Sequence, residues 1–455
     1  MYADKSNKHT FKNKKHIAYG SENKEVIFNA AKVLIENIDE QYGGFGTAAK
    51  TISPEKLLLL LNYYKINPNA ELLKKIEKTL YNMYKGGIFD HLGYGFFRSS
   101  KVRQWTDPVL QKMLYDNLIL IIVYSEAYGI TSKKIYSEVV EKIYEYLVRE
   151  MMNSKGGFYF TDGEDKTADN EFYTWNYPQI EEVLGKKDAV TFCKYYNIPV
   201  SVSGAKGIIP NQIGISINRI RNDERLNRRL ICMCNNLYLK RHQDAKTKKN
   251  YKIYSSLNSL AVAALAHGGR MINNSKLIAS SEKTLRFIYR ELSKEDGRLI
   301  QCLDNGKAEG VAHQRTYAYL IWALIELYCS TLKSTFLNRA IDLNEKMIKN
   351  FWDEKGGGFF TTESNKDKIF RNTSSINGNE AALLNFVHLN RLSLNSEIEN
   401  KASKLLRLYR NQVKEQLDGY EFYIIALIEK NSSISVPSEE INNLMAEVID
   451  INEKE

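Results

Sequence analysis

Apolar residues recur every three or four positions along most of this chain, and that spacing is typical of helices with one buried face. Val26, Ala30 and Val33 share one such face, and Leu257 and Leu260 share another. The pattern predicts helices over 23–39, 54–66, 70–85, 108–129, 132–152, 178–196, 221–242, 255–272, 275–293, 312–330, 334–352, 377–391, 395–414 and 418–430.

A glycine pair followed by aromatic residues recurs between these predicted helices. It reads YGGFG at 42–46, KGGIF at 85–89, KGGFYF at 155–160 and KGGGFF at 355–360, with a looser DGRLI at 296–300. Glycine supplies the positive φ that the chain needs just past a helix end, and the residues that follow favour short extended segments. The recurrence predicts a repeated helical hairpin, although four unrelated helix ends would give the same letters.

Repeated helical hairpins either stack into an open array or close into a ring. An open array has a stricter repeat and an atypical polar cap, whereas the loops here vary in length. We therefore expect an all-α fold, an (α/α)6 toroid with short β segments in its loops, over residues 23–430. Residues 1–22 are expected to form a polar lead-in and residues 431–455 a polar C-terminal tail.

Composition narrows the classes of partner and the location. The net charge is +10, but the lysines are spread along the chain, and no basic stripe with interleaved aromatic residues marks a nucleic-acid site. Five cysteines at irregular spacing suit a reducing compartment, and the longest apolar run, 118–124, is too short to cross a bilayer. We expect a cytoplasmic protein that binds neither nucleic acid nor a membrane.

Motifs for metals and cofactors are missing from the sequence. Cys232 and Cys234 form a Cys-x-Cys without a second pair or a histidine at ligand spacing. Neither a phosphate-binding loop nor a dinucleotide fingerprint is present. We therefore expect no metal and no cofactor.

The loop from Gly86 to Asn117 holds the densest group of candidate site residues. A helix is predicted to begin after it at Pro108, capped by Asp107. An imidazole beside a carboxylate can act as acid or base near neutral pH, so His91 is a candidate catalytic residue with Asp90 orienting it. The alternative is a histidine that only holds the loop by hydrogen bonds.

Further polar residues follow in and after this loop. Arg98 and Trp105 suit a ligand with polar groups and a flat apolar face, such as a sugar, although a surface arginine and a core tryptophan are equally simple readings. Lys112 and Asp116 are spaced to pair on the surface of the predicted helix. Asn117 falls on its apolar face, where it is expected to anchor the preceding loop.

Two later segments add weaker candidates. Asp162 and Asp165, with Glu164, could do acid–base work or bind a cation, but Lys166 stands at a ligand position of a calcium loop, and a solvated acidic turn explains the segment as well. Asn258, near the start of another helix, is either part of a helix cap or a residue of the same cavity.

These segments together resemble a known family, the YyaL or spermatogenesis-associated type, in which a thioredoxin-like domain precedes a six-hairpin toroid similar to that of sugar epimerases and several glycosidases. The matching segments are DHLGYGFFRSS at 90–100, KMLYDN at 112–117 (which contributes Lys112, Tyr115, Asp116 and Asn117 as ligand-binding candidates), EQYGGFGTAAK at 40–50, FYTW at 172–175, FWDEKGGGFFTT at 351–362 and INGNEAA at 376–382.

The sequence also departs from the family pattern. No thioredoxin-like part is recognisable, and acids or a histidine of the family are replaced at four places that the resemblance implies would line the cavity. Val109, Leu110 and Gln111 stand where the family has His-Phe-Glu, and Asn250, Tyr251 and Lys252 stand for Asp-Asp-Lys. Leu257 stands for a tryptophan, and Arg315, Thr316 and Tyr317 stand for Glu-Asp-Tyr. Because valine, asparagine and threonine cannot do acid–base catalysis, the resemblance implies a thinned site.

Three functions follow as hypotheses. The first is a degenerate member of the family that binds a carbohydrate-like ligand or a protein in the central cavity. The second is an active sugar isomerase, epimerase or glycosidase-like enzyme that uses His91. The third is a module that works with a separately encoded thioredoxin-like protein. The replaced cavity residues favour the binding role over the active enzyme.

Overall fold

Six helices form the inner wall of a ring in this computed structural model, which describes residues 11–163, 170–200, 207–244, 249–364, 367–369, 375–415 and 418–432. Each inner helix packs against two inner neighbours, and the last packs against the first, so the ring is closed. The inner helices, in order around the ring, are α2 (Pro54–Ile66), α4 (Leu114–Thr131), α10 (Ser255–Met271), α12 (Gln314–Thr331), α14 (Gly378–Ser393) and α16 (Glu421–Asn431).

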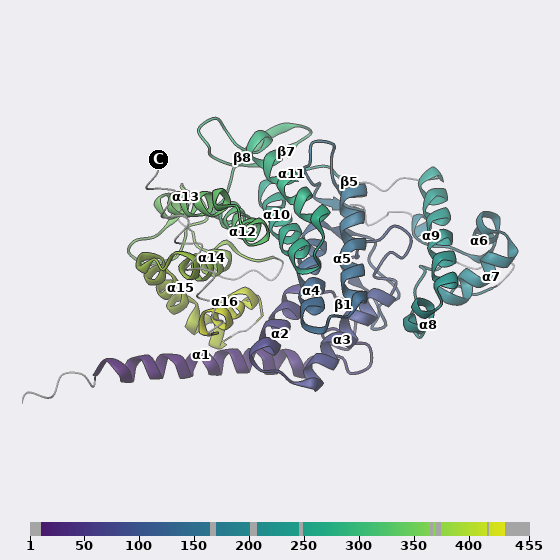
Figure 1. Ribbon diagram of the computed structural model, residues 1–455, viewed down its shortest axis with the longest axis horizontal. Coiled ribbons are helices and arrows are strands. Elements are labelled where there is room, and N and C mark those ends of the chain that lie inside the picture. The colour runs from purple at the N-terminus through teal and green to yellow at the C-terminus, as the bar shows by residue number, and fades with distance from the viewer. Residues whose placement is uncertain are drawn as a thin grey trace, which may run out of the picture.

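Six outer helices surround this wall and alternate with the inner ones along the chain. They are α1 (Phe11–Glu36), α3 (Ala70–Lys85), α5 (Lys134–Tyr146), α11 (Ser275–Glu291), α13 (Ser334–Phe351) and α15 (Ser396–Glu415). In Figure 1, α1 runs past α2 and α16 and extends beyond the ring. The all-α toroid that the hydrophobic period predicts is therefore confirmed.

Burial explains why inner and outer helices differ in sequence. Every residue of α4 from Leu114 to Ala127 is buried, as expected of a helix with neighbours on all sides. In α3, by contrast, the buried residues such as Leu72, Ile76 and Leu80 form one stripe, and the opposite face is polar. The core therefore occupies the space inside the ring and the layer between the two sets of helices.

The recurring glycine pairs mark the turns that follow the outer helices. After five outer helices the chain folds back on itself in a short antiparallel bridge, pairing Ile38 with Phe45, Phe89 with Phe96, Met152 with Phe158, Ser293 with Leu299, and Trp352 with Phe359. Each turn leads the chain back to the end of the ring where the inner helices begin. The repeated helical hairpin is thus present in the structure.

Short strands join the loops at that end. Their bounds are β1 (Lys50–Thr51), β2 (Ser99–Ser100), β3 (Lys112–Met113), β4 (Thr161–Asp162), β5 (Lys249–Asn250), β6 (Ile253–Tyr254), β7 (Ile300–Asp304) and β8 (Lys307–Val311). They form three antiparallel sheets, β1-β2, β3-β4-β5 and β6-β7-β8. A π-helical turn, η1 (Leu147–Met151), extends α5, and a 3-10 turn, η2 (Asn170–Phe172), follows β4.

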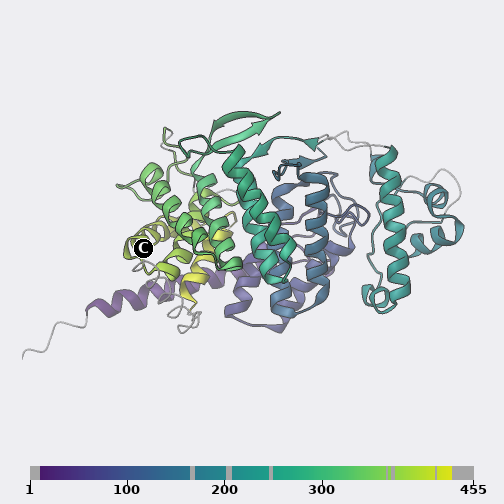
Figure 2. The same ribbon diagram turned by 45° about the horizontal axis from the view of Figure 1, so that its top comes forward.

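A small helical lobe stands beside the ring rather than in it. It contains α6 (Tyr177–Leu184), α7 (Lys186–Tyr195), α8 (Ile217–Asn222) and α9 (Glu224–Asp244), and it lies at the same side of the ring in both ribbon views (Figures 1 and 2). Its own core includes Phe192 and Leu237. The expectation that 23–430 forms one toroid is therefore corrected, since this insertion between α5 and α10 lies outside the ring.

Three predicted boundaries were wrong. The helix expected from Pro108 begins at Leu114, because residues 109 and 111 hydrogen-bond to the neighbouring extended chain, and that pairing overrides the local helix-start signal. The helix expected over 178–196 is divided in two at Gly185, where φ is 73°, whereas the helix expected over 221–242 corresponds to α9. The expected lead-in overlaps α1, which begins at Phe11.

The far end of the ring, where the inner helices finish, is closed by charged side chains. Each inner helix contributes one of them: Lys65, Glu126, His267, Glu326, His388 and Glu429. Positive and negative groups alternate in this order, and ion pairs join Lys65 to Glu126 and His388 to Glu429, both at 2.6 Å. We refer to these six residues as the charged ring.

Candidate functional site

A cavity of about 230 Å³ lies at the end of the toroid where the inner helices begin. The amino-terminal residues of α2, α4, α14 and α16 form most of its wall, and the loop that precedes α4 adds Arg98. The described lining consists of Thr51, Ile52, Ser53, Pro54, Glu55, Lys56, Arg98, Asp116, Ser375, Ile376, Glu380, Asp418, Gly419, Glu421 and Phe422. We call this space the central cavity.

Four carboxyl groups face the central cavity from four different inner helices. Glu55 belongs to the first turn of α2, Asp116 to that of α4, Glu380 to that of α14 and Glu421 to that of α16. Asp116 and Glu380 are buried, and Glu55 and Glu421 are half-buried. Closure of the ring therefore gathers acidic residues that stand far apart in the sequence.

Burial favours the protonated forms of these acids. It raises the pKa of Asp116 to about 7, with a further contribution from the charge of Glu55. Burial likewise raises the pKa of Glu421 to about 7 and raises that of Glu380 well above its ordinary value. Carboxyl groups that exchange protons near neutral pH are suited to acid–base catalysis, which makes this cluster a candidate active site.

Two polar groups in the central cavity lack partners. The Oδ2 atom of Asp116 is buried and has no hydrogen bond to any described residue. Within the same ranges the guanidinium of Arg98 carries no hydrogen bond, and only its charge acts on Glu55 and Asp116. An unsatisfied buried oxygen costs folding free energy, so its retention in a concave site points to a ligand that supplies the missing bond.

The floor of the central cavity is fixed by hydrogen bonds across the ring. The hydroxyl of Tyr115 on α4 bonds to Glu55 and accepts a hydrogen bond of 2.9 Å from the backbone of Ile376. From α12, Tyr319 donates to the carbonyl of Ile376 at 2.5 Å, and Arg315 donates to Ser375 at 3.1 Å. The segment before α14 is thereby held rigidly beneath the carboxyl groups.

Glu380 has a structural task as well as a place in the lining. Its side chain closes a capping box with Asn377 at the start of α14, and it also accepts a hydrogen bond of 3.4 Å from the backbone of Tyr423. These bonds hold Glu380 in place, whereas Asp116 keeps one carboxylate oxygen, Oδ2, without a hydrogen-bond partner among the described residues.

Of the residues singled out in the sequence, Arg98, Tyr115 and Asp116 gather at the central cavity. Asp116 was expected to pair with Lys112 on the surface, and that expectation was wrong. Lys112 is buried and lies 2.8 Å from Asp90, because its strand β3 turns it toward the loop rather than along the helix. Tyr115 supports the cavity from behind through Glu55 and Ile376.

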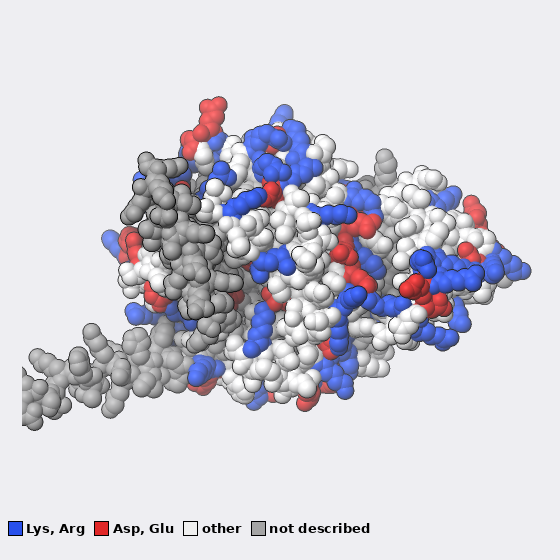
Figure 3. Space-filling view, viewed as in Figure 1, with Lys and Arg blue, Asp and Glu red and all other residues white. Residues whose placement is uncertain are grey.

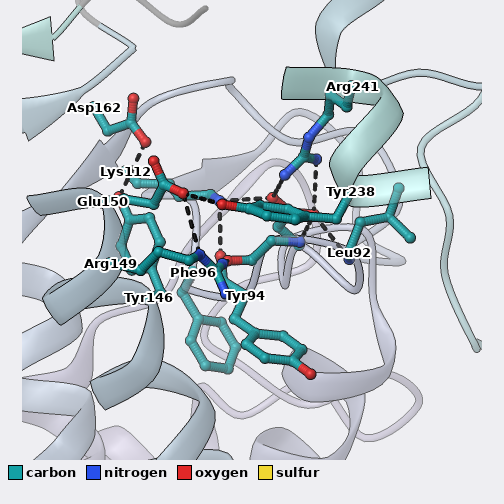
Figure 4. A network of polar contacts seen from close by, with 12 residues as sticks. Leu92, Tyr94, Phe96, Lys112, Tyr146, Arg149, Glu150, Asp162, Tyr238 and Arg241 are labelled. Carbon is teal, nitrogen blue, oxygen red and sulfur yellow. Dashed lines mark hydrogen bonds and ion pairs between the residues drawn. The ribbon is translucent and has the colours of Figure 1, made fainter. Parts of the chain in front are cut away.

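Asp90 binds both Lys112 and Arg241, two residues of a separate buried network that joins the lobe to the ring (Figure 4). Its carboxylate contacts Lys112 at 2.8 Å and Arg241 of α9 at 3.0 Å, and it accepts hydrogen bonds from the backbone of Leu92 and Gly93. Burial alone would raise its pKa, but the charges of Arg241 and Lys112 hold the pKa well below its usual range. Asp90 is therefore engaged with cations and does not orient His91.

His91 lies outside the described lining of the central cavity. It is buried, with Nε2 3.3 Å from the carbonyl oxygen of Lys85, and it packs against the rings of Tyr84, Phe89 and Tyr196. Burial lowers its pKa to about 4, so it is neutral at pH 7. The geometry gives His91 the role of holding the loop, which is the alternative that the sequence left open.

Trp105 lies in the core and not in the cavity. Its ring is fully buried beside Gly44 and Gly86, and Nε1 donates to the carbonyl of Tyr42 at 3.1 Å. A Cβ atom on Gly44 would lie 2.4 Å from the indole, so glycine at position 44 is needed for this close approach. Stacking of Trp105 on a sugar is therefore excluded by its position.

Asn117 and Asn258 are anchors of the loops before their helices. Asn117 accepts a hydrogen bond from the backbone N–H of Phe96 at 2.8 Å and donates to the carbonyl of the same residue at 3.0 Å. Asn258 bonds both backbone groups of Phe158 in the same way, and Asn379 does so for Phe359. The expected anchoring role of Asn117 is confirmed, and it recurs in three hairpins.

The acidic loop after β4 does not contribute to the described lining. Asp162 is buried in β4, where Tyr146 donates to its carboxylate at 3.4 Å. Asp165 and Glu164 lie outside the described residues. Among the residues that are described, no group of three or more histidine, cysteine, aspartate or glutamate side chains is arranged to hold a metal ion.

The residues that replace family acids are absent from the described lining. Val109 and Tyr251 are exposed, and Leu257, which stands where the family has a tryptophan, packs against the core. The described lining instead contains four acids that the sequence did not single out, Glu55, Glu380, Asp418 and Glu421. A signal existed for each, since all four stand in the first turn of a predicted helix, whereas Asp116 was expected well inside the helix predicted from Pro108.

Basic residues are not gathered into one patch on the face of the molecule that is shown in Figure 3. On the face shown in Figure 3, Lys and Arg side chains are scattered among acidic and uncharged residues. Within the densest basic run, Arg241 is buried against Asp90, and Lys249 pairs with Glu150 at 3.0 Å. Of the described helices, none is both long enough and apolar enough to cross a membrane.

Comparison with known proteins places the chain beside curated relatives. It is 27% identical to human spermatogenesis-associated protein 20, in an alignment that covers 73% of this chain and 48% of the human protein. It is 28% identical to the rat protein, in an alignment that covers 73% of this chain and 47% of the rat protein. The chain thus spans about half the length of the curated relatives it matches. The resemblance drawn from the sequence is confirmed, and no family model matches the chain.

Solved structures share the fold at low sequence identity. A D-mannose isomerase matches with a TM-score of 0.58 and 12% identity, covering 93% of this chain and 99% of that one. A glycoside hydrolase family 76 mannosidase from Bacteroides thetaiotaomicron matches with a TM-score of 0.55 and 9% identity, over 92% and 99% of the two chains. The chain therefore has the toroid fold of sugar isomerases and glycosidases.

Proposed function

We propose that this relative of spermatogenesis-associated protein 20 binds a carbohydrate-like molecule in the central cavity and that the carboxyl groups there perform acid–base chemistry on it. The volume of about 230 Å³ is below the roughly 300–1,000 Å³ of sites for drug-sized ligands, which favours a ligand about the size of a single sugar ring. The fold shared with a D-mannose isomerase and a mannosidase supports the same ligand class.

The observation that carries the proposal is the unpaired Oδ2 atom of Asp116. A sugar hydroxyl donates one hydrogen bond and accepts others, so it can satisfy both this oxygen and the unbonded guanidinium of Arg98. Neither group gains such a partner from the described protein. The cavity is therefore complete only when a polyhydroxylated ligand occupies it.

The chemistry follows from the shared pKa range of two of the acids. With pKa values of about 7, Asp116 and Glu421 each exchange a proton near neutral pH, so a state with one protonated and one ionised carboxyl group is accessible there. A pair of this kind donates a proton to one oxygen of the ligand and removes one from another position or from water. Glycosidic bond hydrolysis and sugar isomerisation both require such a pair.

Binding and turnover are tested separately. Calorimetric titration with mannose, glucose and galactose measures binding, and release of nitrophenolate from 4-nitrophenyl glycosides, together with isomer analysis of the hexoses, measures turnover. We expect Asp116→Asn to reduce turnover by about 10² to 10⁴-fold. The matched control is Asp342→Asn, at an exposed position of α13. We expect this control to leave sugar binding and turnover unchanged. Folded protein that binds none of these compounds would overturn the proposal.

A purely binding role is the second candidate, and one observation favours it. Glu380, one of the four acids, is engaged by the backbone of Asn377 and Tyr423, so part of the acidic lining serves the helix start. In that case a sugar raises the melting temperature, but wild type and Asp116→Asn show no turnover. The titration and the turnover assay above distinguish the two candidates.

Partnership with a separately encoded thioredoxin-like protein remains a prediction of the family resemblance. It is tested by co-expression with thioredoxin-like proteins and size-exclusion chromatography of the purified mixture. A stable complex of defined stoichiometry would support it, and separate elution of the two proteins would contradict it.

A further inference from the structure

A second space adjoins the central cavity between α1 and α2. It has a volume of about 360 Å³, and its described lining is Ala30, Val33, Leu34, Asn37, Phe45, Gly46, Leu59, Lys56, Asp418 and Glu421. Most of the residues contributed by α1 and α2 are apolar, whereas the central cavity is lined mainly by acids and other polar groups. We call this space the apolar groove.

Three residues belong to both spaces. Lys56, Asp418 and Glu421 line the central cavity on one side and the apolar groove on the other. The Lys56 ammonium lies 2.6 Å from the Asp418 carboxylate, and it also lies 5.7 Å from the centre of the Phe45 ring. Side chains therefore contribute to the boundary between the two spaces, and the ion pair of Lys56 with Asp418 must open for one ligand to extend past it.

We propose that the ligand is a conjugate whose sugar-sized polar part occupies the central cavity and whose apolar part, joined to it through oxygen, occupies the apolar groove. This inference rests on the proposed function and narrows its substrate class to glycosides of apolar alcohols. The three lining residues that the two spaces share and the opposite polarity of the spaces carry it, because each space matches one half of such a molecule.

The position of Glu421 assigns it a role in the hydrolysis of this conjugate. Because it borders both spaces, Glu421 lies beside the bond that joins the two halves of the ligand. Glu421 gives its proton to the bridging oxygen as the carbon–oxygen bond breaks, and the electron pair leaves with the apolar alcohol. Water adds its hydroxyl group to the sugar carbon and passes its remaining proton to the ionised carboxylate of Asp116.

The test compares methyl and octyl glycosides of the same sugar by calorimetry, below the concentration at which the octyl compound forms micelles. We expect wild type to bind the octyl glycoside at least about tenfold more tightly than the methyl glycoside. Leu34→Gln removes most of that ratio, and Leu337→Gln, at a partly buried position of α13, retains it. If Leu34→Gln does not fold, Val33→Gln, at an exposed position of the same groove, carries the same expectation.

The outcomes separate this inference from the proposed function. If the methyl glycoside binds and the octyl glycoside binds no more tightly, the ligand is not a conjugate with an apolar part. The proposal that the central cavity binds a sugar is then still supported. If neither glycoside binds, the proposed function itself fails. A tenfold ratio that persists in both groove variants would also overturn the inference.

Discussion

The Nε2 atom of His267 lies 3.1 Å from Oε1 of Glu126, so that α10 and α4 are joined by an ion pair at the end of the ring opposite the central cavity. On its other side, Nδ1 of His267 lies 3.4 Å from Glu326, which also binds Arg270 at 3.0 Å. Burial alone would lower the pKa of His267, but the carboxylates of Glu326 and Glu126 outweigh it and raise the pKa to about 9.

This arrangement predicts a loss of stability at alkaline pH. The folded protein holds the His267 proton more tightly than the unfolded chain does, so the contribution is fully present below about pH 6.5 and is lost as pH rises through about 9. The shift corresponds to roughly 3 kcal/mol. Urea unfolding of wild type and His267→Gln between pH 6 and 10 measures how the free energy of unfolding depends on pH. The prediction is contradicted if wild type loses no more stability over this range than the variant does.

Replacement of Asp116 by asparagine is expected to stabilise the protein while it impairs the site. Because burial raises the pKa of Asp116 from 3.8 to about 7, ionisation of this group costs the wild type stability as pH rises from about 4 to about 7. At pH 8 the gain of Asp116→Asn is at most roughly 4 kcal/mol. Thermal unfolding at pH 4 and pH 8 measures it, and an equal effect at the two pH values would rule this explanation out.

Removal of a loop anchor is expected to destabilise the ring. Asn117→Ala leaves the buried N–H and carbonyl of Phe96 without partners, at a cost of about 1–3 kcal/mol for each group. Asn62→Ala, on α2, is the control, because the Asn62 amide only donates to the carbonyl of Leu58 in its own helix. Urea unfolding measures the free energy of unfolding of both variants. Equal losses of stability in the two would show that the hydrogen bonds to the loop contribute little to it.

The lobe is expected to loosen when its ion pair with the ring is broken. Arg241→Met leaves the buried Asp90 with only Lys112, and breaking a buried pair in this way costs about 3–5 kcal/mol. Hydrogen exchange should then rise in α6–α9 while the inner ring stays protected. The double variant Asp90→Asn with Arg241→Met should recover part of the lost stability. A uniform rise of hydrogen exchange over the whole chain would contradict the expectation that this ion pair stabilises the lobe locally.

Local signals in the sequence predicted the helices of the ring well. The predicted spans of 54–66 and 70–85 agree with α2 and α3, because the apolar period that predicts them is a local property of the chain. The start predicted at Pro108 rested on a local cap and was wrong. There, strand pairing of a neighbouring segment outweighs a favourable local cap.

The candidate site was predicted only in part. Arg98 and Asp116 were singled out through the loop and helix that carry them, and both line the central cavity. His91 and Trp105 have equally suggestive neighbours in sequence, yet both are buried outside it. Sequence neighbours share a loop, but the direction of each side chain depends on what packs against that loop.

The sequence by itself determined that paired helices repeat, where most of them begin and end, and that a ring of hairpins results, because hydrophobic period, caps and glycine turns are local properties of the chain. Only the tertiary structure decided that Glu55, Asp116, Glu380 and Glu421 meet, since each comes from a different inner helix and closure of the ring brings them together. Their raised pKa values have the same origin, because burial is a property of the packed ring and not of any one segment.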